Sequence, residues 1–235
     1  MSFPLTHASL LERTRSGDPD VRARAHETLA AVYWGPVYAY VRLTHGAARE
    51  DAEDLTQGFF AEALRRDVFA RYTPGRARFR TYLRTCVDAF VSNERKAQRR
   101  LKRGGQARAV PLDVADLDGR LRSESDVDAV FYNEWVRGVF ALAIARLRER
   151  CDQSDRRHHF TVFERYDLAD VTRGERPTYA QIGAELGVPV TQVTNWLAAA
   201  RREFREIVVD TLREICGSDE EFRAEARALL GLHVR

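Results

Sequence analysis

The sequence has few of the residues that build cross-linked, metal-binding or membrane-embedded proteins. Its three cysteines in 235 residues are far apart and odd in number, which argues against a disulfide framework and a clustered zinc site. No apolar run approaches the length of a membrane span, and the first residues lack the pattern of a signal peptide. No glycine-rich phosphate-binding loop is present. We therefore expect a cytoplasmic, globular protein without membrane insertion.

Charge is plentiful but unevenly distributed. The whole chain has a formal net charge of +3, yet the segment from Arg65 to Arg108 holds fourteen Arg or Lys against three Asp or Glu. A concentrated basic segment favours binding of a polyanion such as nucleic acid, because neutralising phosphates releases counterions. From Val110 to Glu134 the balance reverses, with seven acidic residues against two arginines. This acidic stretch is typical of a linker that is solvated or that lies in a basic channel of a partner.

The basic segment predicts a helix that begins at Phe79. One face of this helix is apolar and the other is basic. The turn-rich loop from Arg71 to Arg78, which precedes the helix, has residues that can stack on or enclose an unpaired base. An ordinary solvated basic face remains the alternative. The predicted inner positions are Phe79, Tyr82, Leu83, Cys86, Val87, Phe90, Ala97 and Leu101. The candidate nucleic-acid contacts are Arg71, Tyr72, Arg76, Arg78, Arg80, Arg84, Arg95, Lys96, Arg99, Lys102 and Arg103.

Two helices are predicted before the basic segment. The first begins near Pro19, and Gly35 with Pro36 should kink or break it. The second, DAEDLTQGFFAEALRR, begins with acidic residues that suit the positive end of the helix dipole. Its outer face could dock a basic partner, although the dipole alone would explain the acids. A metal or acid-base site is disfavoured because no His or Cys lies nearby. The outer-face residues are Asp51, Asp54, Gln57, Gly58 and Ala61.

After the acidic stretch, apolar spacing predicts a helix from Val127 to about Arg150, followed by a polar turn, CDQSDRRHHF. Cys151 with His158 and His159 is too irregular and incomplete to predict a metal site.

A second strong signal is PTYAQIGAELGVPVTQVTNWLAAARREF. Thr178 and Gln181 form a predicted capping box, Gly187 ends the short helix, and a longer helix follows. This pattern predicts a helix-turn-helix whose outer face can enter a major groove, with a plain helical hairpin as the alternative. The longer helix is expected to continue to Cys216, with one more helix in SDEEFRAEARALL. The candidate DNA contacts are Thr191, Gln192, Thr194, Asn195, Arg201, Arg202 and Arg205.

In series, DAEDLTQGFF, FRTYL with its basic helix, and YAQIGAELGVPVTQVTNWLAAARR resemble the extracytoplasmic-function (ECF) group of bacterial RNA polymerase sigma factors. The resemblance covers roughly Leu10 to Phe204. It implies that the acidic helix binds the clamp helices of core RNA polymerase. It also implies that the loop from Arg71 to Arg78 and the basic helix hold the melted minus-ten strand. The helix-turn-helix would read the minus-thirty-five element, and the linker would pass through the transcript channel of the polymerase.

The sequence departs from the family pattern at Tyr82, where many members have Trp, and at Ala89, where many have Asn. We expect an all-α sigma factor that has no catalytic residues, cofactor or metal and binds core RNA polymerase and promoter DNA. The expected regions are 1–105 (region 2-like), 106–126 (acidic linker), 127–216 (region 4-like) and 217–235 (C-terminal extension). An anti-sigma factor or regulatory kinase is an open further partner. The alternatives are a helix-turn-helix regulator without polymerase docking and a metal-dependent nuclease.

Overall fold

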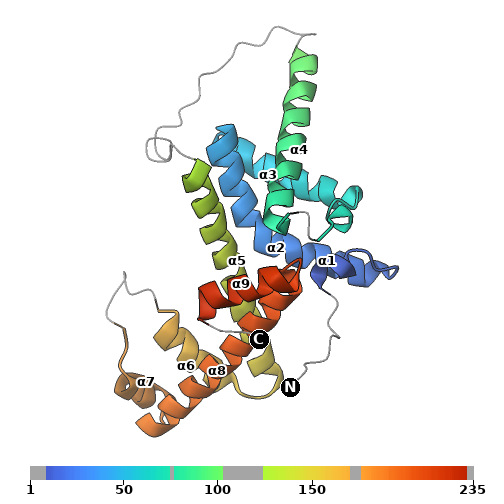
Figure 1. The fold of residues 1–235 in the computed structure, drawn as a ribbon. Helices are drawn as coiled ribbons and strands as arrows, with labels where there is room; N and C mark the ends of the chain where they lie inside the picture. Colours follow the sequence, from blue (N-terminus) through green and yellow to red (C-terminus); the bar gives the residue numbers. More distant parts are fainter. Residues whose placement is uncertain (1–8, 75–76, 103–123, 170–175, 232–235) are drawn as a thin grey trace. The chain divides into compact units, whose positions relative to one another are not determined.

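A computed structural model of the chain describes residues 9–74, 77–102, 124–169 and 176–231, with only the backbone for residues 99–102 and 124–125. Within these ranges the protein is all-helical, as expected, with no strand (Figure 1). None of the described helices is long and apolar enough to cross a membrane. The elements are α1 (Leu10–Arg13), α2 (Pro19–His45), α3 (Arg49–Arg65), the 3-10 helix η1 (Phe69–Arg71), α4 (Phe79–Lys102), α5 (Glu124–Gln153), α6 (Arg157–Asp167), α7 (Tyr179–Leu186), α8 (Val190–Ile215) and α9 (Asp219–Leu230).

The chain forms two compact units. The first comprises Met1–Gly138 together with Leu212–Arg235, and the second comprises Val139–Thr211. Both boundaries fall inside helices, α5 and α8, rather than in a linker. The expected acidic linker lies outside the described residues except for its last three, which begin α5. The C-terminal extension belongs to the first unit.

Helix α2 in the first unit begins where the sequence predicts. The Asp18 side chain caps it by accepting from the Asp20 backbone N–H at 2.9 Å, a contact worth about 1 kcal/mol. Gly35 and Pro36 were expected to kink or break this helix, and α2 continues through them without a break to His45. Proline removes one hydrogen bond from the helix. Fully buried valines on both sides of it, Val32 and Val37, hold this part of α2 in the core.

The core of the first unit is rich in aromatic rings. Helix α2 packs on α1, α3 and α4, and α3 also packs on α4. Of the predicted inner positions of α4, Phe79, Leu83 and Val87 are at most 1% exposed. The predicted Tyr82, Cys86 and Phe90 are half-buried, and Val91, which was not predicted, is completely buried. Phe79 contacts Tyr72 with ring centroids 5.1 Å apart in an edge-to-face arrangement. This packing fixes the direction of α4 and therefore which of its arginines face outward.

The second unit contains the later part of α5, helices α6 and α7, and most of α8. Val139, Ala143, Leu147 and Cys151 of α5 are completely buried at a spacing of four residues. Helix α6 was not expected, because its residues lie partly in the segment predicted to be a turn. Its first residues are polar, but the following Phe160, Val162 and Phe163 are buried.

The start of α7 and the turn after it match the sequence prediction. Thr178 and Gln181 form the reciprocal capping box, and Gly187 adopts a left-handed conformation with φ of 67°. Helix α8 then begins at Val190. On its inner side Val193, Leu197 and Ala200 are at most 1% exposed, so the opposite side of its first turns faces outward.

Candidate nucleic-acid interface

The outer face of α3 is polar and accessible. Asp51, Asp54, Gln57 and Ala61 are all exposed. Gly58 differs from the other four predicted residues because it is half-buried: a Cβ at this position would lie 3.2 Å from the Phe90 ring of α4. Gly58 therefore lies at the α3–α4 packing contact, and the candidate docking face consists of the other four residues.

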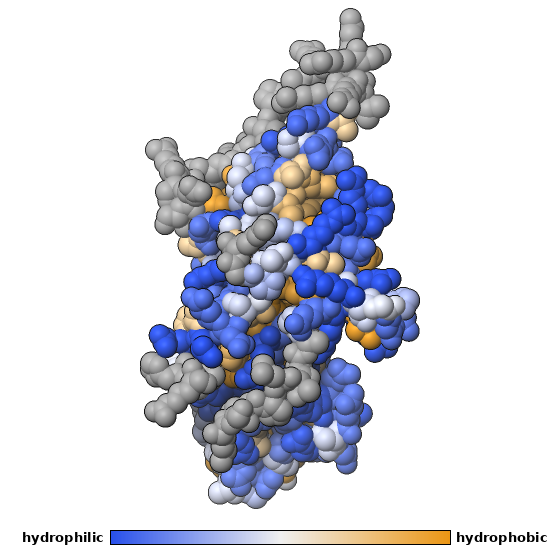
Figure 2. Space-filling model, turned by 45° about the vertical axis from the view of Figure 1, so that its right-hand side comes forward, coloured by the Kyte–Doolittle hydropathy of each residue, from blue (hydrophilic) through white to orange (hydrophobic). Residues whose placement is uncertain are grey.

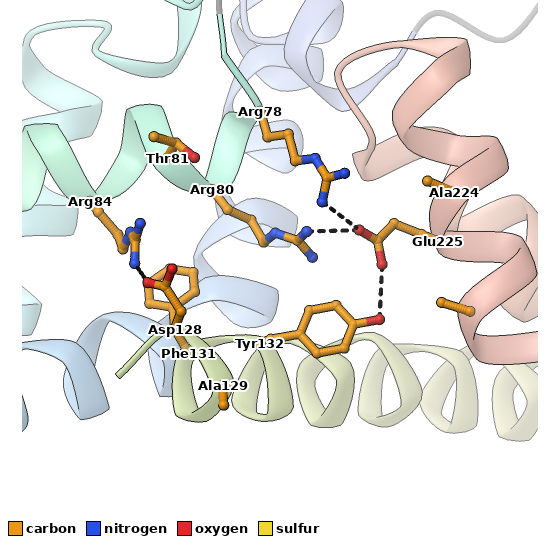
Figure 3. A pocket seen from close by; sticks show the side chains of 11 residues that line it. Arg78, Arg80, Thr81, Arg84, Asp128, Ala129, Phe131, Tyr132, Ala224 and Glu225 are labelled. Carbon is orange, nitrogen blue, oxygen red and sulfur yellow. Dashed lines mark hydrogen bonds and ion pairs between the residues drawn. The ribbon is translucent and has the colours of Figure 1, made fainter. Parts of the chain in front are cut away.

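A hollow of about 550 Å³ lies between α4, α5 and α9, and it contains the first arginines of α4 (Figure 3). The Arg80 side chain is only 13% exposed and donates to the Glu225 carboxylate of α9 at 2.8 Å. Its guanidinium also lies 4.9 Å from the centre of the Tyr132 ring. Arg84 pairs with Asp128 of α5. These two predicted contacts are already occupied by acidic partners from the same chain.

The loop before α4 presents its arginines but buries its tyrosine. Arg71 and Arg78 are exposed, and Arg76 lies outside the described residues. Tyr72 is 2% exposed, and its hydroxyl donates to the Ala77 carbonyl at 2.8 Å. The prediction that Tyr72 contacts a base is therefore not met in this conformation, since packing against Phe79 places its ring in the core.

The second half of α4 emerges from the core as a basic, exposed rod. Val91 is its last buried residue among those described, and residues 92–98 are exposed except for a half-buried Glu94. Arg95 donates to the His45 carbonyl, and Lys96 is exposed. Ala97, expected on the inner face, is exposed because no helix of the described chain covers α4 at this level. Arg99 and Lys102 continue the helix with only their backbone described, and Arg103 lies outside the described residues.

Asp88 lies on α4 and is held by residues of α2. Both of its carboxylate oxygens accept from the Tyr40 hydroxyl at 3.1 Å, and one lies 2.8 Å from the His45 ring. Burial and the Asp88 charge together raise the pKa of Tyr40 to about 12. Asp88 therefore connects α4 to α2 just before the basic half of α4.

The outward side of α8 carries most of its predicted contacts. Thr191, Asn195 and Arg202 are exposed, and Gln192 and Thr194 are half-buried. Arg205 is exposed and has a partner within the chain. Arg201 makes a two-pronged pair with Asp167 of α6, at 2.7 and 2.8 Å. Hydrogen bonding to Asp167 raises the pKa of Arg201, and the pair fastens α8 to α6.

The residues weighed for a metal site do not converge. Cys151 is buried, while His158 stacks on Trp196 with ring centroids 5.1 Å apart. Among the described residues, no group of three or more His, Cys, Asp or Glu side chains is arranged to hold a metal ion.

A few large apolar side chains are exposed on the otherwise polar surface. The face drawn in Figure 2 is mainly hydrophilic, with apolar residues in small separate patches. Trp34 of α2 is 40% exposed and stacks on Phe60 of α3 at 5.7 Å. It lines a hollow of about 810 Å³ that also includes Gln57. An exposed aromatic side chain therefore lies next to the polar face of α3.

Sequence reasoning missed the acidic residues that α9 contributes. Glu221 and Glu225 are 7% and 3% exposed, respectively. Burial raises the pKa of Glu221. A signal was present in the sequence, since both glutamates lie next to residues of the apolar stripe, Phe222 and Ala226, at a spacing of four.

Comparison with models of known protein families, with curated proteins and with solved structures gives no significant match.

Proposed function

We propose that this protein is an alternative RNA polymerase sigma factor of the ECF type, which binds core polymerase, recognises a bipartite promoter and helps to open it. The observation that carries the proposal is the pairing of two surfaces on neighbouring helices of the first unit. The acidic face of α3 is exposed, and the adjacent α4 extends a basic half beyond the core. One surface suits a basic protein partner and the other suits nucleic acid.

Core polymerase docks on α3 in this proposal. Asp51, Asp54 and Gln57 offer carboxylates and an amide to a basic helix pair, and Ala61 permits close approach. Trp34 adds an exposed aromatic side chain beside this polar face. Aromatic residues of this kind are frequent anchors of protein interfaces. The hollow it lines with Gln57 gives room for a partner side chain.

The melted minus-ten strand lies along α4 and the loop before it. Arg71, Arg78 and Lys96 are exposed and positively charged, and the Arg78 guanidinium lies 3.9 Å from the Glu225 carboxylate. Tyr72 cannot stack on a DNA base while its ring is buried in the core. Tyr82 is half-buried and stands where many family members have Trp, so it is the ring that we assign to base stacking.

The minus-thirty-five element is read by α8 as the second helix of a helix-turn-helix with α7. The left-handed Gly187 and the outward Thr191, Asn195 and Arg202 support this role. Arg201 acts differently, holding α8 to α6 through Asp167 rather than binding phosphate. The resemblance also assigns the acidic linker at 106–126 to the transcript channel, and an anti-sigma factor or a kinase is proposed as a further partner.

Co-purification with core RNA polymerase tests the proposal. The wild-type protein should retain core polymerase on a column, and Asp54→Arg should reduce that retention at least tenfold. Glu27→Arg is the matched control, because Glu27 is an exposed acid of the same unit on α2. Absence of core binding together with retention of duplex DNA would instead favour a regulator that acts without polymerase.

A further inference from the structure

Helix α9 is the last described helix of the first unit, and the side that it packs against this unit contains buried carboxylates. Four residues on its inner side are buried, Glu221, Phe222, Glu225 and Ala226. Only two of them are apolar. Buried glutamates are rare unless they are paired, so their partners indicate what this helix does.

Glu225 is bound by residues of α4, α5 and the loop before α4 (Figure 3). One carboxylate oxygen accepts from Arg80 at 2.8 Å and lies 3.9 Å from Arg78. The other accepts from the Tyr132 hydroxyl at 3.0 Å. Two guanidinium groups and a hydroxyl around two anionic oxygens form the same donor arrangement that binds the oxygens of a phosphodiester.

One donor of this site is not paired with Glu225. Arg80 Nη1 is buried and has no hydrogen-bond partner among the described residues. Its guanidinium lies beside the stacked rings of Tyr132 and Trp135, at 4.9 and 4.8 Å from their centres. These cation–π contacts attract the guanidinium independently of its pairing with Glu225. A phosphodiester also has two anionic oxygens, and in place of the Glu225 carboxylate one of them could accept from this remaining donor as well.

The contact between α9 and the arginines is suited to reversal. A buried ion pair adds little net stability, because the desolvation of both charges offsets their attraction. Phe222 and Ala226 are the buried apolar residues of α9, a small apolar contribution for a helix of 12 residues. A competing anion that replaces Glu225 therefore has a modest free energy to overcome.

We propose that Arg78, Arg80 and Tyr132 form a phosphate-binding site for single-stranded DNA and that α9 closes this site in the free protein by placing Glu225 in it. This inference rests on the proposed function, because it adds a regulated phosphate contact to the minus-ten surface. DNA binding and α9 docking are then mutually exclusive. Each weakens the other by the same factor.

Binding of a labelled single-stranded DNA of mixed sequence to the full-length protein tests the competition. Glu225→Gln should bind the DNA about fivefold or more tightly than Glu220→Gln. The control removes the same charge from an exposed position of the same helix. The slope of log affinity against log salt should also become steeper by about 0.7, the value for one added phosphate contact. Equal affinities and equal slopes for the two variants would overturn the proposal.

A second measurement uses the wild-type chain, because Glu225→Gln could also loosen the fold. Cys216, at the junction of α8 and α9, is 5% exposed, and Cys151 of the other unit is fully buried. Single-stranded DNA should accelerate alkylation of Cys216, mapped by mass spectrometry, and leave Cys151 unchanged. Unchanged or slower alkylation of Cys216 in saturating DNA would show that α9 stays docked, and would overturn the proposal.

These outcomes are separable from those of the proposed function. Neither readout contains polymerase, so DNA-driven exposure of Cys216 without any core binding would support the phosphate site and reject the sigma factor. Core binding and promoter opening with no difference between Glu225→Gln and Glu220→Gln would do the reverse.

Discussion

Gly138 of α5 lies against the backbone of Val32 in α2: a Cβ on Gly138 would be 2.4 Å from the Val32 carbonyl oxygen. Val32 is four residues before Pro36, whose missing N–H leaves that carbonyl without its usual helical partner. The absence of a side chain at Gly138 therefore permits the close approach of α5 to α2 beside the proline.

Gly138→Ala should destabilise the first unit, because neither backbone can yield easily to the added methyl group. We expect a loss of about 1–3 kcal/mol, measured by chemical denaturation. Gly17→Ala is the control, since a Cβ there would meet nothing within 4 Å; its effect should stay within about 0.5 kcal/mol. Equal stabilities of the two variants would show that the helices are not in this contact.

His26 should make the folded protein sensitive to acid. Its side chain is 4% exposed, neither ring nitrogen has a hydrogen-bond partner among the described residues, and it stacks on Phe69. Burial lowers its pKa below the ordinary 6.5, with Arg22 adding to this effect and Asp67 opposing it. The folded state thus binds fewer protons than the unfolded state as the pH falls.

The resulting stabilisation is present above pH 6.5 and is lost as the pH falls from there through the lowered pKa of His26. His26→Phe keeps an aromatic ring on Phe69 and cannot titrate, so its unfolding free energy should depend less on pH than that of the wild type between pH 7 and the acid limit of folding. Thermal unfolding across this range measures the difference. Parallel curves for the two proteins would contradict the assignment to His26.

Parts of the fold were predictable wherever local chemistry determines an element. The capping box of Thr178 and Gln181 and the start of α4 at Phe79 follow from short-range pattern alone. The passage of α2 through Pro36 was not predictable, because it depends on tertiary packing around Val32 and Val37. Helix α6 was missed because its first turn is polar.

The candidate site was predictable in its charges but not in their partners. The sequence indicates that α3 is acidic and α4 basic, and the accessible Asp54 and Lys96 agree with those faces. Whether an arginine is free or paired depends on residues far away in the chain: Arg80 and Glu225 are 145 positions apart. No helical periodicity reveals such a pair, and the burial of Tyr72 is likewise a property of the assembled core.

Trp34 should contribute to polymerase binding. It is 40% exposed beside Gln57, and its indole would be buried by a partner docked on α3. We expect Trp34→Ala to weaken core polymerase affinity by about tenfold or more, corresponding to more than about 1.4 kcal/mol. Val21→Ala is the control, because Val21 is an exposed apolar residue in the first turn of α2, away from α3 residues Asp54 and Gln57 in the sequence and 13 positions before Trp34. Equal binding by both variants would remove Trp34 from the interface.

Lys96 should contribute to DNA binding but not to polymerase binding, because it lies on the exposed half of α4. Lys96→Glu is expected to weaken single-stranded DNA binding severalfold and to reduce the salt slope by about 0.7. Reversal of Arg99 and Lys102 together should abolish promoter opening. Arg24→Glu, at an exposed position of α2, controls for total charge. Loss of polymerase binding in Lys96→Glu equal to its loss of DNA binding would contradict this separation of roles.

Reconstituted transcription tests the central claim most directly. Purified core RNA polymerase would be incubated with fragmented genomic DNA, with and without the full-length protein, and the 5′ ends of the transcripts would be sequenced. The sigma-factor proposal predicts new transcripts that start at discrete sites, share two upstream sequence elements and decline with Asp54→Arg but not with Glu27→Arg. Transcripts that are the same in number and position with and without the protein would contradict it.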